Sequence, residues 1–403
     1  MKFSNEVLFI LSGLTALVIV ALSIPSIIKV ARAKNLYDYP DSRKAHRNSI
    51  PTLGGLAIFA ALIVSVLLWT DSKSIAEIKY ILAALVLIFF IGLKDDILVI
   101  APDKKLIIQI LAALILAILG DIRITNLHGF AGIYHIPYFI SLMITVFVTI
   151  VVLNGMNLID GIDGLASGVG IITSVTFGIY FYLVKQYQYV IFMSAVIGSL
   201  SAFFFYNVFG KKNKIFMGDT GSLIIGLILA VFAIKFNEFN LVANGGFHLK
   251  SAPSVSIGIL MIPLFDTFRV FIIRLIKRKS PFKADNNHVH HKLLQIGCSH
   301  IQATLIIVGA NLLFIGLAFI LSNMGIIPLL LTLISVATVL SFIPSLMIYY
   351  QKNKYIKEPV IRRFPISNVG ILLEGEFDKF NNYPSEELEE SKEELEIEKI
   401  KVS

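Results

Sequence analysis

Long apolar stretches alternate with short polar connections along most of the chain. A helix that crosses a bilayer needs about 20 apolar residues, because each residue adds 1.5 Å toward about 30 Å of hydrocarbon. The pattern therefore predicts an all-α, polytopic membrane protein with about eleven transmembrane helices. The predicted helices are centred near residues 18, 60, 87, 113, 145, 174, 197, 226, 263, 312 and 338.

The predicted orientation follows from lysine and arginine, which gather in alternate connections. They are concentrated in the first, third, seventh and ninth connections and after the last predicted span. Because these residues favour the cytoplasmic side of a membrane, we expect the odd-numbered connections to be cytoplasmic. The same rule places the N-terminus outside and the C-terminus in the cytoplasm.

Polar and acidic residues replace the apolar pattern near residue 351. Residues 1–350 are predicted to form the transmembrane domain, and residues 351–403 a cytoplasmic polar tail. The tail ends in an acidic run from Glu386 to Glu398, whose aliphatic residues are too sparse for a core. We therefore expect a solvated, partly disordered tail, with a partner-binding helix as the alternative.

Composition supports a membrane protein and excludes other classes. Hydrophobic residues make up 56% of the chain and charged residues 15%, a balance that soluble domains of this length do not have. The formal net charge of +8 could indicate nucleic-acid binding, but the bases lie in short connections where they orient the helices, so no nucleic acid is expected as a partner. Cys298 is the only cysteine, so the chain forms no internal disulfide.

Five polar motifs lie at the ends of predicted spans, where ionisable side chains are costly beside hydrocarbon. In chain order they are Lys44–Arg47, Asp95–Asp96, Asn154–Gly164, Phe216–Ser222 and His288–His291. The predicted topology places all five in odd-numbered connections, on the cytoplasmic face. A secondary transporter would instead hold its polar residues near the midplane, so the arrangement favours an enzyme at the membrane surface.

Asp95, Asp96 and Asp219 each have a structural and a chemical interpretation. Asp95 and Asp96 could be solvated residues at a helix end, or they could share a metal ion or provide a base. Asp219 could cap the helix that follows it. A helix N-terminus also presents free amides to phosphate, and a carboxylate there can hold Mg²⁺ against a diphosphate.

Asp160 and Asp163 form a stronger acidic signal. They are three residues apart and each is followed by glycine, so we expect them on one face of a helical turn with the backbone open to a ligand. Asn154 and Asn157 extend that face by one turn. Four polar side chains at this spacing within an apolar sequence are difficult to explain by packing.

Two basic motifs suit phosphate. The histidines of His288–His291 could bind zinc, but only Cys298 lies near as a further ligand and the surrounding bases would repel a cation. Contact with phosphate oxygens therefore fits them better. Lys44, His46 and Arg47 could serve only to orient the protein, but the turn that follows would hold them at the membrane surface, which favours a binding role.

Together the motifs resemble the polyprenyl-phosphate N-acetylhexosamine-1-phosphate transferase family, from about Arg43 to Gly297. The resemblance implies transfer of N-acetylhexosamine-1-phosphate, in particular GlcNAc-1-phosphate, from a UDP-sugar to undecaprenyl phosphate with release of UMP. Mg²⁺, or Mn²⁺ in its place, is the implied cofactor. The implied location is the bacterial cytoplasmic (inner) membrane, with the active site on its cytoplasmic face, at the first membrane step of a surface polysaccharide pathway. A homodimer is also compatible with the resemblance.

The resemblance also implies roles for individual residues, all within residues 1–350, the predicted catalytic domain. The implied catalytic acids are Asp95, Asp96, Asp160 and Asp163, and the implied metal ligands are Asp219 and Asp163. Phe216 resembles the aromatic residue that stacks on uracil. The implied substrate-binding residues are Lys44, His46, Arg47, Asn154, Asn157, Phe216, His288, His290 and His291.

One position departs from the family pattern. Val99 stands where the aspartate-rich motif has a third carboxylate, and Asp103 is four residues late. The role of that carboxylate cannot be transferred to this chain. A transporter or flippase and an inactive membrane scaffold remain as alternative functions, the second because of this substitution.

Overall fold

The computed structural model describes residues 3–34, 36–38, 50–71, 75–98, 100–242, 247–278 and 287–357. The chain divides into a large unit, Met1–Lys352, and a small one, Asn353–Ser403. Of the small unit, only residues 353–357 at the end of the last helix are described. The predicted acidic tail therefore lies outside the described residues.

The described residues are mostly helical, as the sequence predicts. The helices are α1 (Asn5–Ala33), α2 (Gly54–Trp69), α3 (Ile75–Leu98), α4 (Pro102–Leu114), α5 (Tyr138–Ile159), α6 (Leu165–Leu183), α7 (Tyr187–Phe209), α8 (Gly218–Val242), α9 (Ala252–Ile259), α10 (Met261–Ile276), α11 (Val289–Gln295), α12 (His300–Ile320) and α13 (Ile326–Lys357). A short π-helix, η1 (Ile115–Leu119), continues α4.

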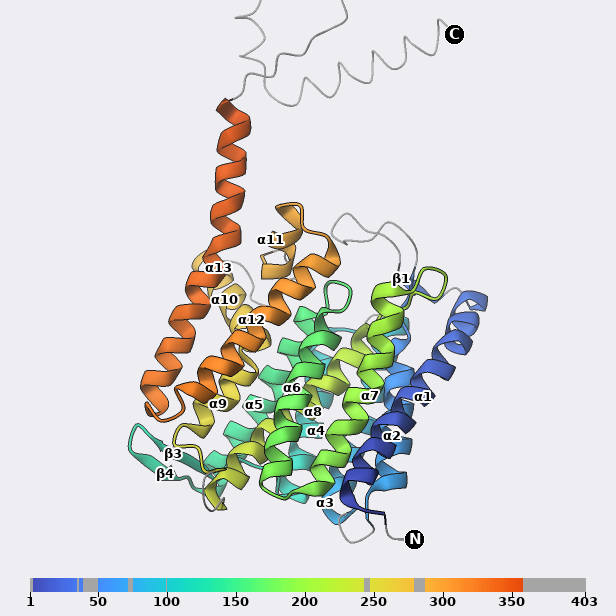
Figure 1. Ribbon diagram of the computed structural model, residues 1–403, viewed down its shortest axis with the longest axis vertical. Coiled ribbons are helices and arrows are strands. Elements are labelled where there is room, and N and C mark those ends of the chain that lie inside the picture. Colours follow the sequence, from blue (N-terminus) through green and yellow to red (C-terminus); the bar gives the residue numbers. More distant parts are fainter. Residues whose placement is uncertain are drawn as a thin grey trace, which may run out of the picture. The chain divides into compact units, whose positions relative to one another are not determined.

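Two short antiparallel sheets, which the all-α prediction did not include, join this bundle. β1 (Tyr37–Asp38) pairs with β2 (Ile50–Pro51), and β3 (Asn126–Phe130) pairs with β4 (Ile133–His135). In Figure 1, β1 and α11 lie at one end of the large unit, and the β3–β4 hairpin lies at the opposite end. The two sheets therefore lie at opposite ends of the large unit, outside its helical core.

Seven of the described helices are long and apolar enough to cross a membrane: α1, α5, α6, α7, α8, α12 and α13. α2 is a shorter apolar helix. Each of the eleven predicted centres falls within a helix of the structure. A multi-pass membrane protein is thus confirmed, whereas the count of eleven spans and the orientation of the termini stay predictions.

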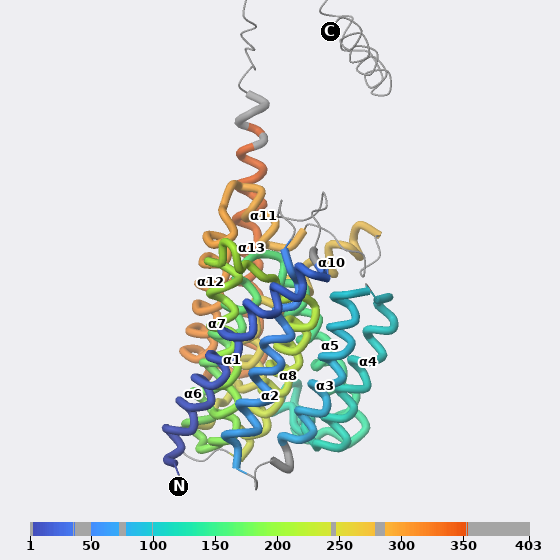
Figure 2. The backbone as a smooth tube through the Cα atoms, turned by 90° about the vertical axis from the view of Figure 1, so that its right-hand side faces the viewer, coloured from blue at the N-terminus to red at the C-terminus, as the bar shows by residue number. Residues whose placement is uncertain are grey.

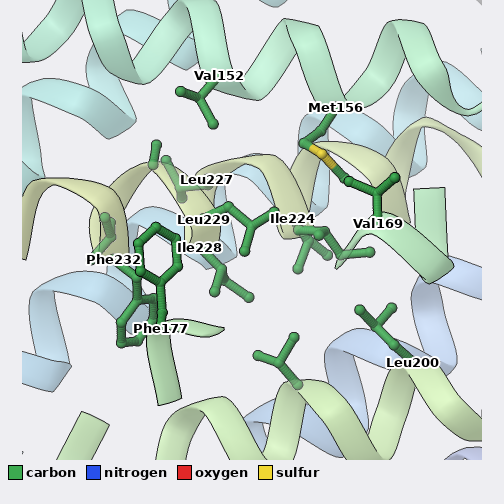
Figure 3. Packing of buried hydrophobic residues seen from close by; sticks show 14 of the residues in the cluster. Val152, Met156, Val169, Phe177, Leu200, Ile224, Leu227, Ile228, Leu229 and Phe232 are labelled. Atoms are coloured by element: carbon green, nitrogen blue, oxygen red, sulfur yellow. The ribbon is translucent and has the colours of Figure 1, made fainter. Parts of the chain in front are cut away.

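α8 forms the centre of the bundle. It packs against α2, α3, α5 and α6, and 89% of its most apolar segment is buried, compared with 22% for α1. Figure 3 shows Ile224, Ile228 and Phe232 of α8 among apolar side chains of α5, α6 and α7. A helix that is apolar on all sides is expected in such a central position.

Small residues bring the ends of α2, α3 and α8 close together. A Cβ at Gly92 of α3 would lie 2.6 Å from Thr220 Cα, and one at Gly55 of α2 would lie 2.8 Å from Gly221 Cα. Only glycine permits such a close approach of backbones. α4 in turn packs against α3 and α5, as Figure 2 shows. This packing sets the positions of the acidic residues at the helix ends.

Candidate functional site

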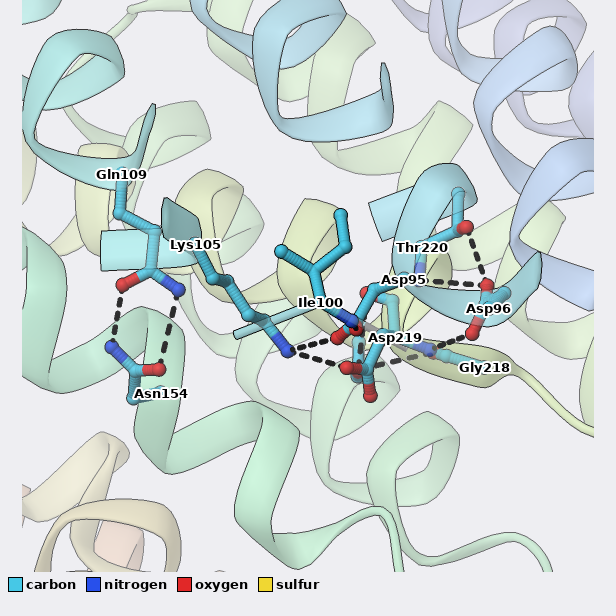
Figure 4. Close-up of polar contacts among 10 residues, drawn as sticks. Asp95, Asp96, Ile100, Lys105, Gln109, Asn154, Gly218, Asp219 and Thr220 are labelled. Carbon is cyan, nitrogen blue, oxygen red and sulfur yellow. Dashed lines mark hydrogen bonds and ion pairs between the residues drawn. The ribbon is translucent and has the colours of Figure 1, made fainter. Parts of the chain in front are cut away.

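Asp95, Lys105 and Asp219 meet where α3, α4 and α8 converge (Figure 4). Lys105 Nζ lies 3.0 Å from Asp95 Oδ2 and also forms an ion pair with Asp219 Oδ2. The backbone N–H of Ile100 donates to Asp95 Oδ1 at 2.5 Å. Two carboxylates from segments far apart in the sequence therefore face one cationic group.

Asp96 joins α3 to the first turn of α8. Its Oδ1 accepts a hydrogen bond from the N–H of Asp219 at 2.7 Å, and its Oδ2 accepts from Thr220 Oγ1 at 2.5 Å and from the N–H of Thr220 at 3.1 Å. The carboxylate thus caps the free amides of a helix N-terminus. It thereby fixes Asp219 beside Asp95.

Asp160 belongs to the same acidic cluster. α5 ends at Ile159, and Asp160 begins the turn that leads into α6. Burial, together with the charges of Asp219, Asp96 and Asp163, raises the pKa of Asp160 to about 8. In the absence of a bound cation, the Asp160 carboxyl group is therefore mostly protonated at neutral pH.

Asp163 faces other partners. Its Oδ2 lies 2.6 Å from Lys214 Nζ and 2.9 Å from His300 Nδ1, and Thr304 Oγ1 donates to its backbone carbonyl at 2.7 Å. Burial alone would raise the pKa of Asp163, but the hydrogen bonds and charges of His300 and Lys214 outweigh it and lower the pKa. The structure brings Asp163 to these bases, whereas Asp95 shares the cationic group with Asp219.

The expected helical turn that would carry both Asp160 and Asp163 is not formed, so this prediction is wrong. The chain leaves helical geometry at Asp160, and Gly164 adopts a φ of +78°, which favours glycine. The N–H of Gly164 donates to Asn207 Oδ1 at 2.6 Å. This turn directs the two acids to different neighbours.

The histidine segment lies against the turn that follows Asp160. His288, His290 and His291 lie close together, with 4.2 Å between the ring centroids of His290 and His291. A Cβ at Gly161 would lie 3.0 Å from His290 Cε1, so the imidazole covers this glycine. Burial and then the charge of His291 lower the pKa of His290 to about 3, so its ring is neutral near pH 7.

The remaining predicted residues have distinct environments. Asn154 and Gln109 exchange side-chain hydrogen bonds of 2.8 and 3.2 Å between α5 and α4, next to the acidic cluster (Figure 4). Asn157 lies in the last turn of α5. Phe216 is held by its backbone, which bonds to Pro51 at 2.8 Å and to Gly54 at 2.9 Å.

Phe216 is partly exposed, and Lys214 Nζ lies 5.9 Å from the centroid of its ring. The base-rich motif of Lys44, His46 and Arg47 lies outside the described residues, as does Val99. The structure therefore brings together four of the five motifs, within the part of the chain that it describes.

Sequence reasoning missed several residues that the site contains. Lys105, Lys214 and His300 each pair with a predicted acid, but only the fold reveals which base meets which acid. Asp266 pairs with His288 at 2.8 Å between Oδ2 and Nδ1. A signal was present for Asp266, because it is the only carboxylate in the apolar sequence from Ser251 to Arg278.

Comparisons with known proteins show what this chain is similar to. The family model described as glycosyl transferase family 4 matches residues 78–237. A decaprenyl-phosphate N-acetylglucosaminephosphotransferase of Mycolicibacterium smegmatis is 31% identical over 321 residues, which cover 74% of this chain and 78% of that protein. An undecaprenyl-phosphate alpha-N-acetylglucosaminyl 1-phosphate transferase of Yersinia pestis is 28% identical over 303 residues, which cover 74% of this chain and 80% of that protein.

A second protein with the latter name, from Escherichia coli (strain K12), is 28% identical over 284 residues, or 69% of this chain and 74% of that protein. The matched family segment contains Asp95, Lys105, Asp160, Asp163 and Asp219. The family model therefore covers the helix ends that form the acidic site. The chain therefore belongs to glycosyl transferase family 4.

Proposed function

We propose that this chain transfers GlcNAc-1-phosphate from UDP-GlcNAc to a polyprenyl phosphate, specifically undecaprenyl phosphate, and releases UMP. The observation that carries the proposal is the convergence of Asp95 and Asp219 on the single cationic group of Lys105, at the end of a bundle of apolar helices. Two carboxylates can hold a divalent cation, and that cation together with the lysine would offset the negative charge of two phosphorylated reactants. The names of the relatives supply the sugar and the class of lipid.

Mg²⁺ is the cofactor that these residues fit. The described residues contain no group of three or more His, Cys, Asp or Glu side chains arranged to hold a metal ion. Mg²⁺ does not need such a group, because it keeps several waters and is commonly bound by one or two carboxylates and the phosphates of a substrate. Asp219 and Asp95 offer oxygen ligands that already face one positive charge, so they would hold the ion.

Electrostatic repulsion is the main obstacle to the reaction. Two unit charges 4 Å apart repel by about 4 kcal/mol at an effective dielectric constant near 20. Bound Mg²⁺ would supply positive charge to the diphosphate. Lys105 contributes a further positive charge, and its ammonium group, fixed between two helices, can donate to a phosphate oxygen beside the acids.

Asp96 and Asp160 have supporting roles in this proposal. Asp96 keeps Asp219 in place through its three hydrogen bonds to α8. Asp160 carries a proton near neutral pH while no cation is bound, because its pKa is raised to about 8. A protonated carboxyl group can donate a hydrogen bond to a phosphate oxygen without adding negative charge.

Phe216 and the histidine segment are the proposed contacts of the nucleotide and of phosphate oxygens. Phe216, which is partly exposed and fixed by its backbone bonds, is the aromatic residue on which uracil would stack. The histidine segment lies against the turn that follows Asp160 and offers imidazoles to phosphate oxygens. The basic connections favour the cytoplasmic face of the bacterial inner membrane for this site.

A test of the function uses the purified full-length chain with undecaprenyl phosphate, Mg²⁺ and a panel of UDP-sugars. We expect UMP release with UDP-GlcNAc, dependent on the lipid and abolished by a chelator. Release with another UDP-hexosamine alone would correct the sugar and keep the reaction type. An absence of UMP with every sugar, from protein that elutes as a folded species, would refute the proposal.

A further inference from the structure

Asp266 of α10 is a buried carboxylate outside the acidic cluster. Only 5% of the residue is exposed, and both of its oxygens accept hydrogen bonds. His288 Nδ1 lies 2.8 Å from Oδ2, Arg269 Nη2 lies 2.7 Å from Oδ1, and the N–H of Val289 lies 3.2 Å from Oδ1. A carboxylate is costly to bury, so this set of donors is the reason that Asp266 can remain there.

Arg269, one helical turn after Asp266 in α10, also binds the segment that contains His288. Its Nη2 also donates to the backbone carbonyl of Asn287 at 2.7 Å. Asp266 and Arg269 therefore hold the backbone at residues 287 and 289, on both sides of His288. α11 has only 7 residues, too few to fix the histidine rings through helix formation alone.

The ring of His288 stacks on the ring of His290. The rings of His288 and His290 are nearly parallel, with an interplanar angle of 12° and centroids 5.6 Å apart. His290 is 2% exposed and packs against Gly161, next to Asp160. Contacts therefore run from Asp266 through two imidazoles to the acidic cluster.

The carboxylate also selects one tautomer of His288. An ionised carboxylate can only accept hydrogen bonds, so Nδ1 of His288 must carry a proton that points to Asp266. Nε2 is then the nitrogen that remains for another partner. Removing Asp266 would free both the ring rotation and the choice of tautomer.

We infer that Asp266 is a positioning residue, which holds His288 in the one orientation and tautomer that present Nε2 to a phosphate oxygen of the substrates. The inference rests on the proposed function, because transfer of GlcNAc-1-phosphate is its readout. Asp266 itself contacts no substrate. Its effect on turnover passes through His288.

A double-mutant cycle tests this inference with Asp266→Asn, His288→Gln and the double variant, assayed by UMP release. We expect kcat to fall by about 10- to 100-fold in each single variant, the range for a residue that orients a functional histidine. The double variant should be no slower than His288→Gln alone, because Asp266 acts only through that ring. The KM values for both substrates should change by less than about threefold, since the loss belongs to the transition state.

A matched control separates positioning from charge removal. Asp121 also pairs with an arginine, Arg123 at 2.7 Å, but it lies in the connection between η1 and α5, and Asp121→Asn should leave UMP release unchanged. Thermal unfolding of each purified variant checks that it is folded. If Asp266→Asn does not fold, Asp266→Glu keeps the charge and replaces it in the cycle.

The outcomes separate the two claims. Losses that add in the double variant, or a His288→Gln variant with normal kcat, would overturn the positioning role and leave the proposed function standing. A wild-type chain that releases no UMP would refute the proposed function, and with it this inference.

Discussion

At the scale of single residues, the site depends on which charges face one another. Asp95 and Asp219 both pair with Lys105, and Asp163 pairs with Lys214 and His300. Each pairing joins different helices or connections of the chain. Asp160 and Asp163 are both followed by glycine in the sequence, but their surroundings raise the pKa of Asp160 and lower that of Asp163. Environment, more than residue type, assigns each acid its role.

Phe216 gives a test of nucleotide binding. Replacing Phe216 with Ala should raise the KM for UDP-GlcNAc by about 5- to 150-fold, because a base stacked on an aromatic ring contributes about 1–3 kcal/mol. The KM for undecaprenyl phosphate should stay unchanged. Phe209→Ala is the control, since Phe209 is 55% exposed at the end of α7. An unaltered KM for UDP-GlcNAc in Phe216→Ala would exclude stacking.

The pairing of Asp163 with His300 and Lys214 can be tested by the pH dependence of stability. Burial would raise its pKa, but His300 and Lys214 hold the pKa below the ordinary value of 3.8. A lowered pKa stabilises the folded state above pH 3.8, and this contribution is lost as the pH falls through the pKa of the folded state. Asp163→Asn should therefore lower the free energy of unfolding by about 1–3 kcal/mol at pH 6.

The loss should diminish as the pH falls below 3.8 toward the lower pKa of the folded state, through which the wild-type carboxylate becomes protonated. Chemical denaturation in detergent at pH 6 and pH 3 measures it. Asp121→Asn should change stability by at most about 1 kcal/mol, because Asp121 is exposed. A deficit in Asp163→Asn that is equally large at both pH values would contradict the assigned pairing.

At the scale of helices, glycine contacts position the acids. The backbones of α3 and α8 approach at Gly92 and Thr220 so closely that a Cβ would collide, and Asp96 then caps α8. The sequence predicted both helices and the polar residues at their ends. It could not predict their contact, because a glycine in an apolar stretch does not indicate which helix it faces.

Gly92→Ala should separate α3 from α8. We expect a loss of about 1–3 kcal/mol in stability from overpacking, and a larger relative loss of UMP release because Asp95 moves away from Asp219. Gly309→Ala in α12 is the matched control, since a Cβ there meets nothing within 4 Å. Activity and a melting temperature equal to those of the wild type in Gly92→Ala would show that this contact does not set the site.

The turn after α5 shows where sequence reasoning fails at this scale. The spacing of Asp160 and Asp163 suits a helix, but the helix ends at Ile159 and Gly164 takes a positive φ. Local spacing therefore predicted a helical geometry that this turn does not have. Lys105 was also missed as a site residue, because a single lysine in a basic connection is what orientation alone requires.

At the scale of the whole molecule, successive predicted spans run in opposite directions, so alternate connections bring distant motifs to one end of the bundle. Hydrophobic periodicity located a helix at each predicted centre, since the length of an apolar stretch is a direct physical requirement of the bilayer. The predicted meeting of motifs holds for Asp95, Asp160, Asp219 and the histidine segment. Partners such as Asp266 depend on tertiary packing, which the pattern does not encode.

The predicted topology can be tested with single cysteines in a Cys298→Ser background. Lys212 precedes α8 and Lys185 follows α6, and both are exposed. An impermeant maleimide should label Lys185→Cys in intact cells, and should label Lys212→Cys only after permeabilisation, because the two connections lie on opposite sides of the membrane. Labelling of both from the same side would contradict the topology.

The most direct test of the account is the binding of Mn²⁺, as a paramagnetic substitute for Mg²⁺, measured by electron paramagnetic resonance with UDP-GlcNAc present. The account predicts saturable binding by the wild-type chain that weakens by at least about 100-fold in Asp219→Asn, since a charged ligand is lost. Asp121→Asn should bind as the wild type does. Equal Mn²⁺ affinity in Asp219→Asn and the wild type would contradict the assignment of Asp219, and with it the proposed site.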